Sequence, residues 1–587
     1  RAKSLFLENY IVQLGLSGKD SFCALVCVLE GLKQAIKINP YVGPLYVVTT
    51  NTTLDNFAVH DYILSLHNDL DSYALQNELP VITRELKPAL SRLPIVEYVG
   101  MGKLIRTPET GSNRECAVDW KLMPAKRFLT KIKEEHRTDK VISVSGSRHD
   151  ESLARAASLA SRRESAAKPV MTDLGWSLPI IADWSLTDVF KLIDAIDDGG
   201  IETFTDNVDG LKKHYSAANG GTCDLFAAGG VKSSKPCSSR FGCTLCFQIS
   251  EDNSLQGQIS SSPSTYGFMQ PFVALRRFLK NTLYDYPRSR SLLAREIKKD
   301  SWIKVGFNHY SLAYRQELLR YILTIDVREQ ERAELYGEDP MFQLVDYPTL
   351  TMIQYHWARE GGESSPGEAF QIWHEVYTEN KRYDIPETTE AKKDKLYLKY
   401  GSETIEVSNT KLAYRYLNLN DFCQAGEEWN NFGYGLEINE WQKQYTPAYS
   451  LTDDAGRLVE VCPYEESRGL SVNADGGLWE YIESDFPAFM SLYNKLKQEG
   501  EAQLPDPTFI LTELLSRKLV IVNRGSAPKL HRDAKLAQFM NQALRLGCND
   551  SASILRYSVS EAEYVAAVKV SEKTGRQVES GQFELSL

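Results

Sequence analysis

Residues 15–21, GLSGKDS, have the composition of a loop that holds a phosphate group. They follow an apolar, strand-like run, YIVQL, and precede an amphipathic run that begins FCALVCVLEGLKQA. Backbone N–H groups at the start of a helix lack partners and favour an anion, while Gly18 permits close approach and Lys19 adds positive charge. The loop is not a Walker A motif, because Gln13 stands where that motif requires Gly. The alternative is an ordinary strand–turn–helix with a Ser cap.

A second stretch, residues 220–248, carries clustered cysteines among Gly, Ser and Pro: Cys223, Cys237, Cys243 and Cys246. Such thiols in a chain without a secretion signal indicate a metal site rather than disulfides. Zinc would form a closed tetrahedral site, whereas an iron–sulfur cluster accepts less regular Cys spacing. Zinc ribbons usually show two C-x-x-C pairs, and this stretch has only the pair Cys243 and Cys246.

Strand-like and helix-like runs alternate over the first 200 residues and must position these loops. The alternation is typical of βαβ units, so we expect an α/β domain with a mainly parallel sheet and helices on both faces. Ligands of such sheets bind outside the carboxyl ends of the strands. Three polar stretches at predicted strand ends are expected to meet there: GLSGKDS, TTNTTLD (49–55) and SGSRHDES (145–152).

The length of 587 residues predicts several domains. We divide the chain into an α/β domain (1–200), a Cys-rich loop insertion (201–260), a basic helical segment (261–340) and a largely helical C-terminal region with some strands (341–587). A net charge of −11 argues against a globally basic nucleic-acid-binding protein, but permits a local basic patch. The sequence shows neither a run of about twenty apolar residues nor a secretion signal, so we expect a cytoplasmic protein without membrane partners.

Five motifs occur in an order known from one enzyme family: SGKDS, NTTLD, ECAVDWKLMPAKRF (115–128), SGSRHDESLAR (145–155) and PIIADWSLTDVF (179–190). Together they resemble the PAPS-reductase-like family of PP-loop ATP pyrophosphatases over about the first third of the chain. The resemblance implies an adenine nucleotide alpha hydrolase-like fold and cleavage of ATP between its α and β phosphates. The family's loop reads S-G-G-K-D-S, so Leu16 and Ser17 replace its first Ser and Gly. The hydroxyl lost at Leu16 could be supplied by Ser17.

The resemblance also implies a nucleotide site. Its ATP-binding residues would be Ser17, Gly18, Lys19, Asp20, Ser21, Asp55, Arg148 and Arg155. Pyrophosphate leaves with concentrated negative charge, so we expect catalysis to depend on Lys19, Asp20, Lys121 and Arg148. Asp20 and Asp55 are expected to approach a Mg²⁺ that the phosphates share. Alternatively, Arg148 and Arg155 form surface ion pairs with Glu151, and Lys121 lies on a solvated helix face.

Members of this family that bear a cluster combine a C-x-x-C pair with a Cys in the motif that contains Cys116 here. The resemblance therefore implies a [4Fe–4S] cluster on Cys116, Cys237, Cys243 and Cys246, with Cys223 in reserve. Because Cys116 and Lys121 share one motif, we expect the cluster beside the nucleotide site. Cys23 and Cys27 are four residues apart on an apolar helix and are expected to pack in the core.

The SRFGCTLC segment, residues 239–246, resembles that of DndC-type DNA phosphorothioation proteins within this family. This resemblance implies that ATP adenylates a DNA backbone phosphate, and that sulfur from a cysteine desulfurase replaces a non-bridging oxygen. Further partners would be the other proteins of a phosphorothioation system in bacterial defence. Alternatives are a PP-loop tRNA thiolase and an adenylyl-sulfate reductase, which the Cys-free end GRQVESGQFELSL disfavours. A non-catalytic scaffold with a Cys₄ zinc site is the alternative outside enzymes.

Residues 276–320 form the most basic stretch that is also rich in aromatic residues. Its basic residues include Arg276, Arg277, Lys280, Arg288, Arg290, Arg295, Lys298, Lys299 and Lys304, and its aromatic residues include Tyr284, Tyr286, Trp302, Phe307 and Tyr310. Basic side chains can follow phosphates and aromatic rings can stack on unpaired bases, so we expect DNA contact here. The alternative is a helical bundle with a solvated basic face.

Overall fold

A computed structural model of the chain describes residues 1–108, 115–172, 175–218, 241–291, 293–298, 302–306, 308–391, 396–400, 403–407, 415–418, 470–501, 504–523, 525–528, 530–531, 533–534, 537–538, 541 and 556–573. The chain divides into two compact units. Unit 1 comprises Arg1–Pro88 and Thr107–Val273, and unit 2 comprises Ala89–Arg106 and Ala274–Leu587. The ranges 1–200 and 201–260 of the sequence analysis therefore fall mostly into one unit.

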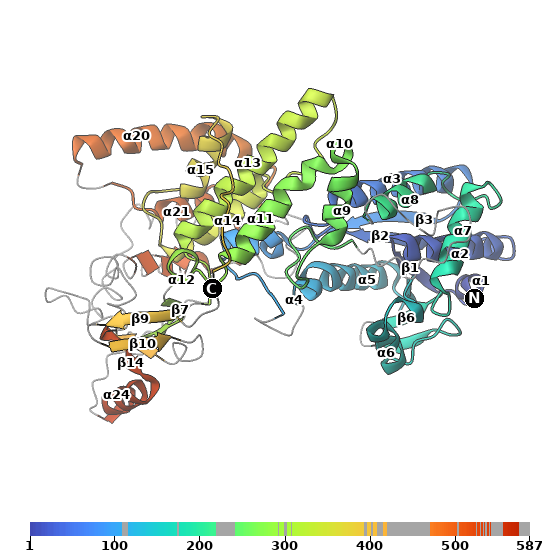
Figure 1. Ribbon diagram of the computed structural model, residues 1–587, viewed down its shortest axis with the longest axis horizontal. Helices are drawn as coiled ribbons and strands as arrows, with labels where there is room; N and C mark the ends of the chain where they lie inside the picture. Colours follow the sequence, from blue (N-terminus) through green and yellow to red (C-terminus); the bar gives the residue numbers. More distant parts are fainter. Residues whose placement is uncertain are drawn as a thin grey trace. The chain divides into compact units, whose positions relative to one another are not determined.

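Unit 1 is built on a six-stranded sheet with the order β3-β2-β1-β4-β6-β5 (Figure 1). The strands are β1 (Ile11–Gly15), β2 (Leu45–Thr50), β3 (Val81–Leu86), β4 (Val141–Ser145), β5 (Val170–Thr172) and β6 (Gly175–Pro179). Neighbouring strands are parallel, except that β5 runs antiparallel to β6 at one edge. The predicted α/β class with a mainly parallel sheet is confirmed.

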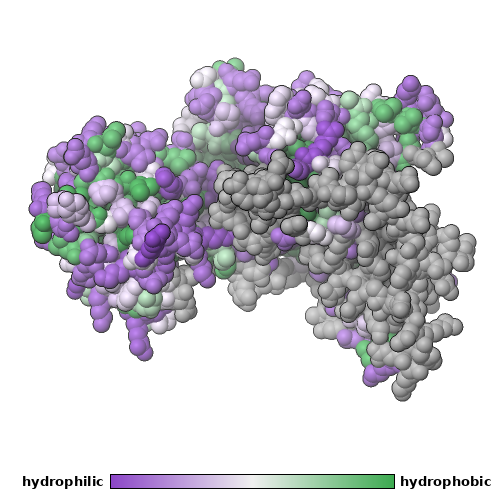
Figure 2. Space-filling view, turned by 180° about the vertical axis from the view of Figure 1, so that it is seen from behind, coloured by the Kyte–Doolittle hydropathy of each residue, from purple (hydrophilic) through white to green (hydrophobic). Residues whose placement is uncertain are grey.

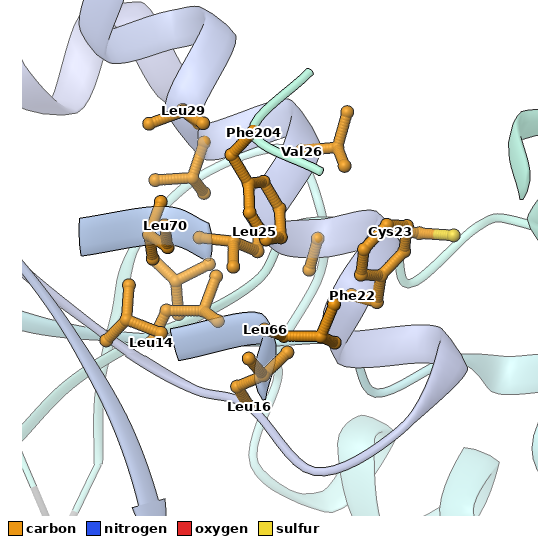
Figure 3. Packing of buried hydrophobic residues seen from close by; sticks show 14 of the residues in the cluster. Leu14, Leu16, Phe22, Cys23, Leu25, Val26, Leu29, Leu66, Leu70 and Phe204 are labelled. Atoms are coloured by element: carbon orange, nitrogen blue, oxygen red, sulfur yellow. The ribbon is translucent and has the colours of Figure 1, made fainter. Parts of the chain in front are cut away.

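Successive side chains of each strand enter different cores, as the period of two in a strand requires. Val12 and Leu14 of β1 belong to the larger core, which Figure 3 shows around α2 (Lys19–Ile36). That core also holds side chains of α3 (Phe57–Gln76) and α7 (Leu186–Asp197). Ile11 of the same strand belongs to a smaller core with Ile132 of α5 (Met123–His136). Helices therefore cover both faces of the sheet, as predicted.

Further helices of unit 1 surround this framework. They are α1 (Ala2–Leu7), α4 (Glu115–Ala117), the π-helical turn η3 (Val118–Leu122), η4 (His149–Glu151), α6 (Leu153–Ser161), α8 (Val208–Ala218), α9 (Asn253–Ser261), α10 (Pro263–Tyr266) and η5 (Gly267–Met269). The loops after β1 and β4 thus each lead directly into a helical segment.

Unit 2 combines helices with small antiparallel sheets (Figure 1). From α11 onward the helices are α11 (Gln270–Asn281), α12 (Tyr286–Ser289), α13 (Leu312–Tyr336), α14 (Tyr347–Glu360), α15 (Glu368–Tyr377), α19 (Leu478–Glu480), η9 (Tyr481–Asp485), α20 (Phe486–Glu499), α21 (Phe509–Ser516) and α24 (Glu561–Lys573). The strands are β7 (Leu293–Lys298), β8 (Trp302–Val305), β9 (Leu396–Tyr400), β10 (Glu403–Val407), β11 (Arg415–Asn418), β12 (Ser471–Val472), β13 (Val520–Ile521) and β14 (Val559–Ser560). β7 and β8, which were predicted to lie within a basic helical segment, therefore form an antiparallel strand pair.

Residues 89–106 join unit 2 through buried hydrogen bonds, and contain η1 (Leu90–Arg92) and η2 (Val96–Gly100). Trp357 Nε1–H of α14 donates to Val99 O at 2.9 Å, and Arg315 Nη1–H of α13 donates to Gly100 O at 2.7 Å. These bonds satisfy carbonyls of a buried segment that would otherwise lose its hydrogen bonds to water. On the face shown in Figure 2, hydrophobic residues occur in scattered groups among hydrophilic ones.

Candidate nucleotide site

A cavity opens where the strand order of unit 1 reverses. β1 pairs with β2 on one side and with β4 on the other, so the switch point lies between β1 and β4. Loops at such a point leave a crevice in which ligands of open α/β sheets bind. The cavity measures about 670 Å³ and is lined by Gly15, Ser17, Gly18, Lys19, Asp20, Ser21, Ser145, Gly146, Ser147, Arg148, Asp150, Glu151, Arg155, Leu186, Tyr215 and Phe241.

The loop after β1 is closed by its own serine. Ser21 Oγ accepts hydrogen bonds from the N–H groups of Ser17 and Gly18 at 2.9 and 3.1 Å, and donates one to Gly18 O at 2.9 Å. Ser21 therefore shapes the loop. α2 begins directly after Gly18, its N-cap residue, and its first residues line the cavity. The dipole of this 18-residue helix favours an anion at that end.

The burial of Leu16 accounts for an apolar residue at this position of the loop. Its side chain is only 1% exposed and lies in the larger core (Figure 3). Its N–H donates to Val48 O at 2.8 Å, and its carbonyl accepts from Thr49 Oγ1 at 2.8 Å. Leu16 thus extends the packing of β1 by one residue, while Ser17 is the residue that lines the cavity.

Lys19, Asp20 and Arg148 form one charged group at the cavity. Lys19 Nζ lies 3.1 Å from Asp20 Oδ2, and Arg148 Nε–H donates to Asp20 Oδ1 at 2.8 Å. Arg148 is 2% exposed and also donates through Nη1 to Trp184 O at 3.3 Å, so its position is fixed. The alternative of a surface ion pair is wrong for Arg148.

Arg155 lies at the cavity in a different setting. Its side chain is exposed, and its Nε–H donates to Glu151 Oε2 at 3.1 Å, one helical turn away. This is the ion pair that the alternative interpretation predicts. Because Arg155 lines the same cavity, it can exchange Glu151 for an anion at small cost.

Tyr215 was not predicted as a residue of the site, and Gly146 lies in a predicted stretch but was not singled out. The hydroxyl of Tyr215 on α8 accepts from Lys19 N–H at 3.5 Å, and Lys19 Nζ lies 4.9 Å from the ring centroid of Tyr215. Tyr215 also makes an edge-to-face contact with Phe241, with ring centroids 5.0 Å apart. Gly146 supports the loops from the other side, because an added Cβ would meet the Asp20 carbonyl oxygen at 2.5 Å. A Gly inside SGS after a predicted strand is a weak signal of such an approach, and the sequence around Tyr215 gives none.

If ATP is cleaved in this cavity, replacing Gly146 with Ala is expected to lower its turnover by about 100-fold, because the added Cβ displaces the backbone of Asp20 and Ser21 and misplaces the reacting groups. The rate of AMP release measures this effect. Gly15→Ala is the matched control, since Gly15 lines the same cavity and an added Cβ there meets nothing within 4 Å. Equal losses in the two variants would contradict the argument.

A second group of predicted residues lies at the loop after β2. Lys121 Nζ of η3 lies 3.0 Å from Asp55 Oδ1, and Asp55 Oδ2 accepts from Thr52 N–H at 2.8 Å. Burial opposes ionisation of Asp55, but the Lys121 ammonium and the Thr52 N–H hold the pKa of Asp55 below its usual value. Burial would likewise lower the pKa of Lys121, yet the Asp55 carboxylate raises it to about 12. Asp55 and Lys121 do not line the cavity that the loop after β1 borders.

The C-x-x-C segment is attached to this second group. Thr244 N–H donates to Leu54 O at 2.6 Å, and Asn56 N–H donates to Gly242 O at 3.2 Å. Cys243 Sγ lies 3.7 Å from Asp55 Oδ1. Burial, and after it the Asp55 carboxylate, raises the pKa of the Cys243 thiol to about 12. Without a bound cation Cys243 is therefore a protonated thiol rather than a nucleophile.

Three of the four predicted cluster ligands lie within the described residues, namely Cys116, Cys243 and Cys246. Cys243 and Cys246 form a tight turn, in which Cys246 N–H donates to Cys243 O at 3.0 Å. Cys116 is half-buried, while Cys237 and the reserve ligand Cys223 lie outside the described residues. Within the described ranges, no group of three or more His, Cys, Asp or Glu side chains is placed to hold a metal ion. Cys23 is fully buried and packs in the larger core, as predicted, with Cys27 packed against that core.

The predicted DNA-binding stretch is largely structural. Arg290 is 4% exposed and donates through Nε to Leu283 O at 3.1 Å, and Arg288 pairs with Glu317. Trp302 and Tyr310, two of the rings expected to stack on bases, are 8% and 0% exposed. The prediction that Arg290, Trp302 and Tyr310 contact DNA is wrong, because these side chains are buried inside unit 2, whereas for the partly exposed Arg288 it stays a prediction. The side chains of Arg295, Lys298 and Lys299 lie outside the description.

Comparison with protein-family models and with curated proteins finds no match for the chain. A search of the described helices finds none with the length and apolar character needed to cross a membrane. The chemistry must therefore be argued from the site. Two fixed cations and a helix N-terminus border the cavity, together with the carboxylates of Asp20, Asp150 and Glu151. Such a set can bind a polyphosphate and complete the oxygen shell of a Mg²⁺ that the phosphates mainly hold.

Proposed function

We propose that the protein is an ATP pyrophosphatase that adenylates a DNA backbone phosphate for sulfur incorporation. The observation that carries the proposal is the cavity at the β1–β4 switch point. There the start of α2 brings Lys19, and the loop after β4 brings Arg148. Both cations fit a triphosphate whose β and γ phosphates leave together as pyrophosphate.

The residues supply charge and position in this reaction. A DNA phosphate oxygen attacks the α phosphorus of ATP, the bond to the β phosphate breaks, and Lys19 and Arg148 stabilise the leaving pyrophosphate. Asp20 holds both cations in place through its two carboxylate oxygens. The terminal sulfur of a persulfide on a cysteine desulfurase partner then displaces AMP from the activated DNA phosphate, and a thiol reductant cleaves the resulting S–S bond, which leaves the phosphorothioate and a disulfide.

The Asp55–Lys121 group would act beside the Cys segment. Lys121 carries its charge at neutral pH and stands against Asp55, which Cys243 also contacts. We propose that Cys243 and Cys246, with Cys237 and Cys116, hold a [4Fe–4S] cluster. A cluster supplies a fixed, thiolate-bound centre that anchors the segment to the loop after β2.

Product analysis tests the proposed reaction. ATP with Mg²⁺ is incubated with the protein, with and without duplex DNA, and the nucleotide products are separated. We expect pyrophosphate from the first step and AMP where water, in the absence of a sulfur donor, attacks in place of sulfur, with a higher yield of pyrophosphate when DNA is present. Formation of ADP and phosphate as the main products would overturn the proposal.

The helix α5 is the expected DNA contact in unit 1, since it directly follows the turn that carries Lys121. Lys126 and Lys131 on α5 are exposed. If each neutralises a phosphate, the Lys126→Ala/Lys131→Ala variant should reduce the log–log salt slope of DNA binding by about two. Fluorescence anisotropy of labelled DNA at several salt concentrations measures the slope. Lys37→Ala/Lys140→Ala is the control, because Lys37 follows the end of α2 and Lys140 precedes β4, at the amino edge of the sheet.

A further inference from the structure

A pocket in unit 2 is independent of the proposed nucleotide site. It measures about 560 Å³ and lies among α13, α14, α15 and η9. Three aromatic side chains line it, Tyr347, Trp373 and Tyr377, together with the carboxylate of Glu483. η9, which carries Glu483, is a π-helical turn like η2 and η3, a rare conformation that is frequent at functional sites.

The walls of this pocket are fixed by packing and hydrogen bonds. Trp373 and Tyr377 stack with ring centroids 4.8 Å apart, and Tyr347 lies 5.7 Å from Trp373. His374 Nε2–H donates to Ile482 O at 2.7 Å, which ties α15 to η9. The hydroxyl of Tyr347 donates to Glu483 Oε1, which places the carboxylate beside the rings. A pocket held in this way is formed before its ligand arrives.

The charge of the pocket selects the sign of its ligand. Glu483 is its acidic group, and the residues that line it include neither Lys nor Arg. Among the described residues, no Lys or Arg forms an ion pair with Glu483. The faces of aromatic rings are also negative and attract cations. His374 also lines the pocket, but its Nε2–H donates to Ile482 O and its Nδ1 contacts Thr378 Oγ1, so neither ring nitrogen is left for an anion and the pocket favours a cation.

We infer that the pocket binds an alkylated ammonium group. Such a group needs no hydrogen-bond acceptors and gains from aromatic surroundings. A guanidinium prefers both oxygens of a carboxylate, and the hydrogen bond from Tyr347 occupies one acceptor site of Glu483 Oε1. A primary ammonium is strongly hydrated and would have to exchange its water for the oxygens of Glu483, Gln330, Gln343 and Thr378, whereas an alkylated ammonium needs none of them. The volume of about 560 Å³ accommodates the cationic group with the stem that carries it.

The test compares choline with its uncharged isostere 3,3-dimethyl-1-butanol, using the full chain. Binding is measured by calorimetry and by ¹⁹F NMR of 5-fluorotryptophan-labelled protein, in which Trp373→Phe assigns the Trp373 signal. We expect choline to bind about tenfold more tightly than the alcohol and to shift the Trp373 signal. Ammonium chloride tests whether a bare ammonium ion is sufficient for binding. An acetylated trimethyllysine amide tests whether the alkylated cation can be carried by a peptide side chain. Equal binding of choline and the alcohol, or binding of neither, would overturn the inference.

Two pairs of variants locate the effect. Glu483→Gln keeps the size of the side chain and should weaken choline binding about threefold to fivefold, because Glu483 is exposed. Glu480→Gln removes the same charge three residues away, outside the pocket, and should leave binding unchanged. Tyr347→Phe keeps the ring but loses the hydrogen bond that places Glu483, so it should weaken binding no more than Glu483→Gln does, whereas Tyr347→Leu should weaken it further. Equal losses in Glu483→Gln and Glu480→Gln would reduce the effect to net charge and contradict the proposed site. Because these measurements use no nucleotide, their outcome does not depend on the proposed ATP cleavage.

Discussion

Arg148→Ala is expected to lower the rate of ATP cleavage by about 100-fold to 1000-fold, the loss seen when one preorganised charge-stabilising donor is removed. The reason is that Arg148 is buried and held by Asp20 and by the carbonyl of Trp184, so it reaches the leaving phosphates without reorganisation. Its loss also leaves Asp20 paired with Lys19 alone, which reduces the positive charge that Lys19 offers to phosphate. The rate of AMP formation at saturating ATP measures the effect.

Two further variants separate charge from folding. Arg148→Lys keeps the positive charge. The planar guanidinium of Arg148 donates to both Asp20 and the Trp184 carbonyl, and a single ammonium cannot replace it, so this variant should recover only part of the rate. Arg162→Ala removes an arginine that pairs with Glu164 at the end of α6, outside the cavity, and should leave the rate unchanged. Full activity in Arg148→Ala with an unchanged melting temperature would mean that the cavity is not the site of ATP cleavage.

The sequence was sufficient to predict that the loops after β1 and β4 meet. Strand and helix periods locate the carboxyl ends of the strands, and in a parallel sheet these ends share one edge. The same reasoning could not say which strands are neighbours. β2 and β4 both flank β1. Of the loops that follow these two strands, only the one after β4 lines the cavity together with the loop after β1. Asp55, after β2, therefore belongs to a separate group with Lys121.

Contacts between distant parts of the chain also could not be predicted from the sequence. Tyr215 meets Lys19 across 196 residues, and no local pattern marks a single Tyr on an amphipathic helix as part of a site. The prediction of DNA contact by Arg290, Trp302 and Tyr310 was wrong for a related reason. Composition shows that Arg and aromatic residues alternate, but it does not show whether they face water or each other. Arg290 lies 6.0 Å from the ring centroid of the buried Tyr310, so the alternation stabilises a core.

The second large effect concerns the cysteines. Protein prepared without oxygen is expected to contain about four iron atoms per chain and to show the broad absorption of a thiolate-bound cluster. Cys243→Ser and Cys246→Ser should each lose the iron, because a serine hydroxyl is a poor replacement for a thiolate ligand. Cys27→Ser is the matched control, since Cys27 is a partly buried cysteine that packs against the core on α2, and it should retain the iron. Iron and zinc analysis of each purified variant provides the measurement.

Cys116→Ser tests the fourth ligand. The turn at Cys243 and Cys246 is attached to the loop after β2, and Lys121 of η3 reaches that loop through Asp55. Cys116 on α4 precedes η3 directly, so the chain brings it toward the same loop. Loss of iron in Cys116→Ser, but not in Cys223→Ser, is therefore expected. Loss of iron in Cys223→Ser but not in Cys116→Ser would make Cys223 the fourth ligand instead of Cys116. One tightly bound zinc in place of iron would favour a structural Cys₄ site. In that case zinc would displace the proton of the Cys243 thiol despite its raised pKa, because zinc also binds the thiolate form.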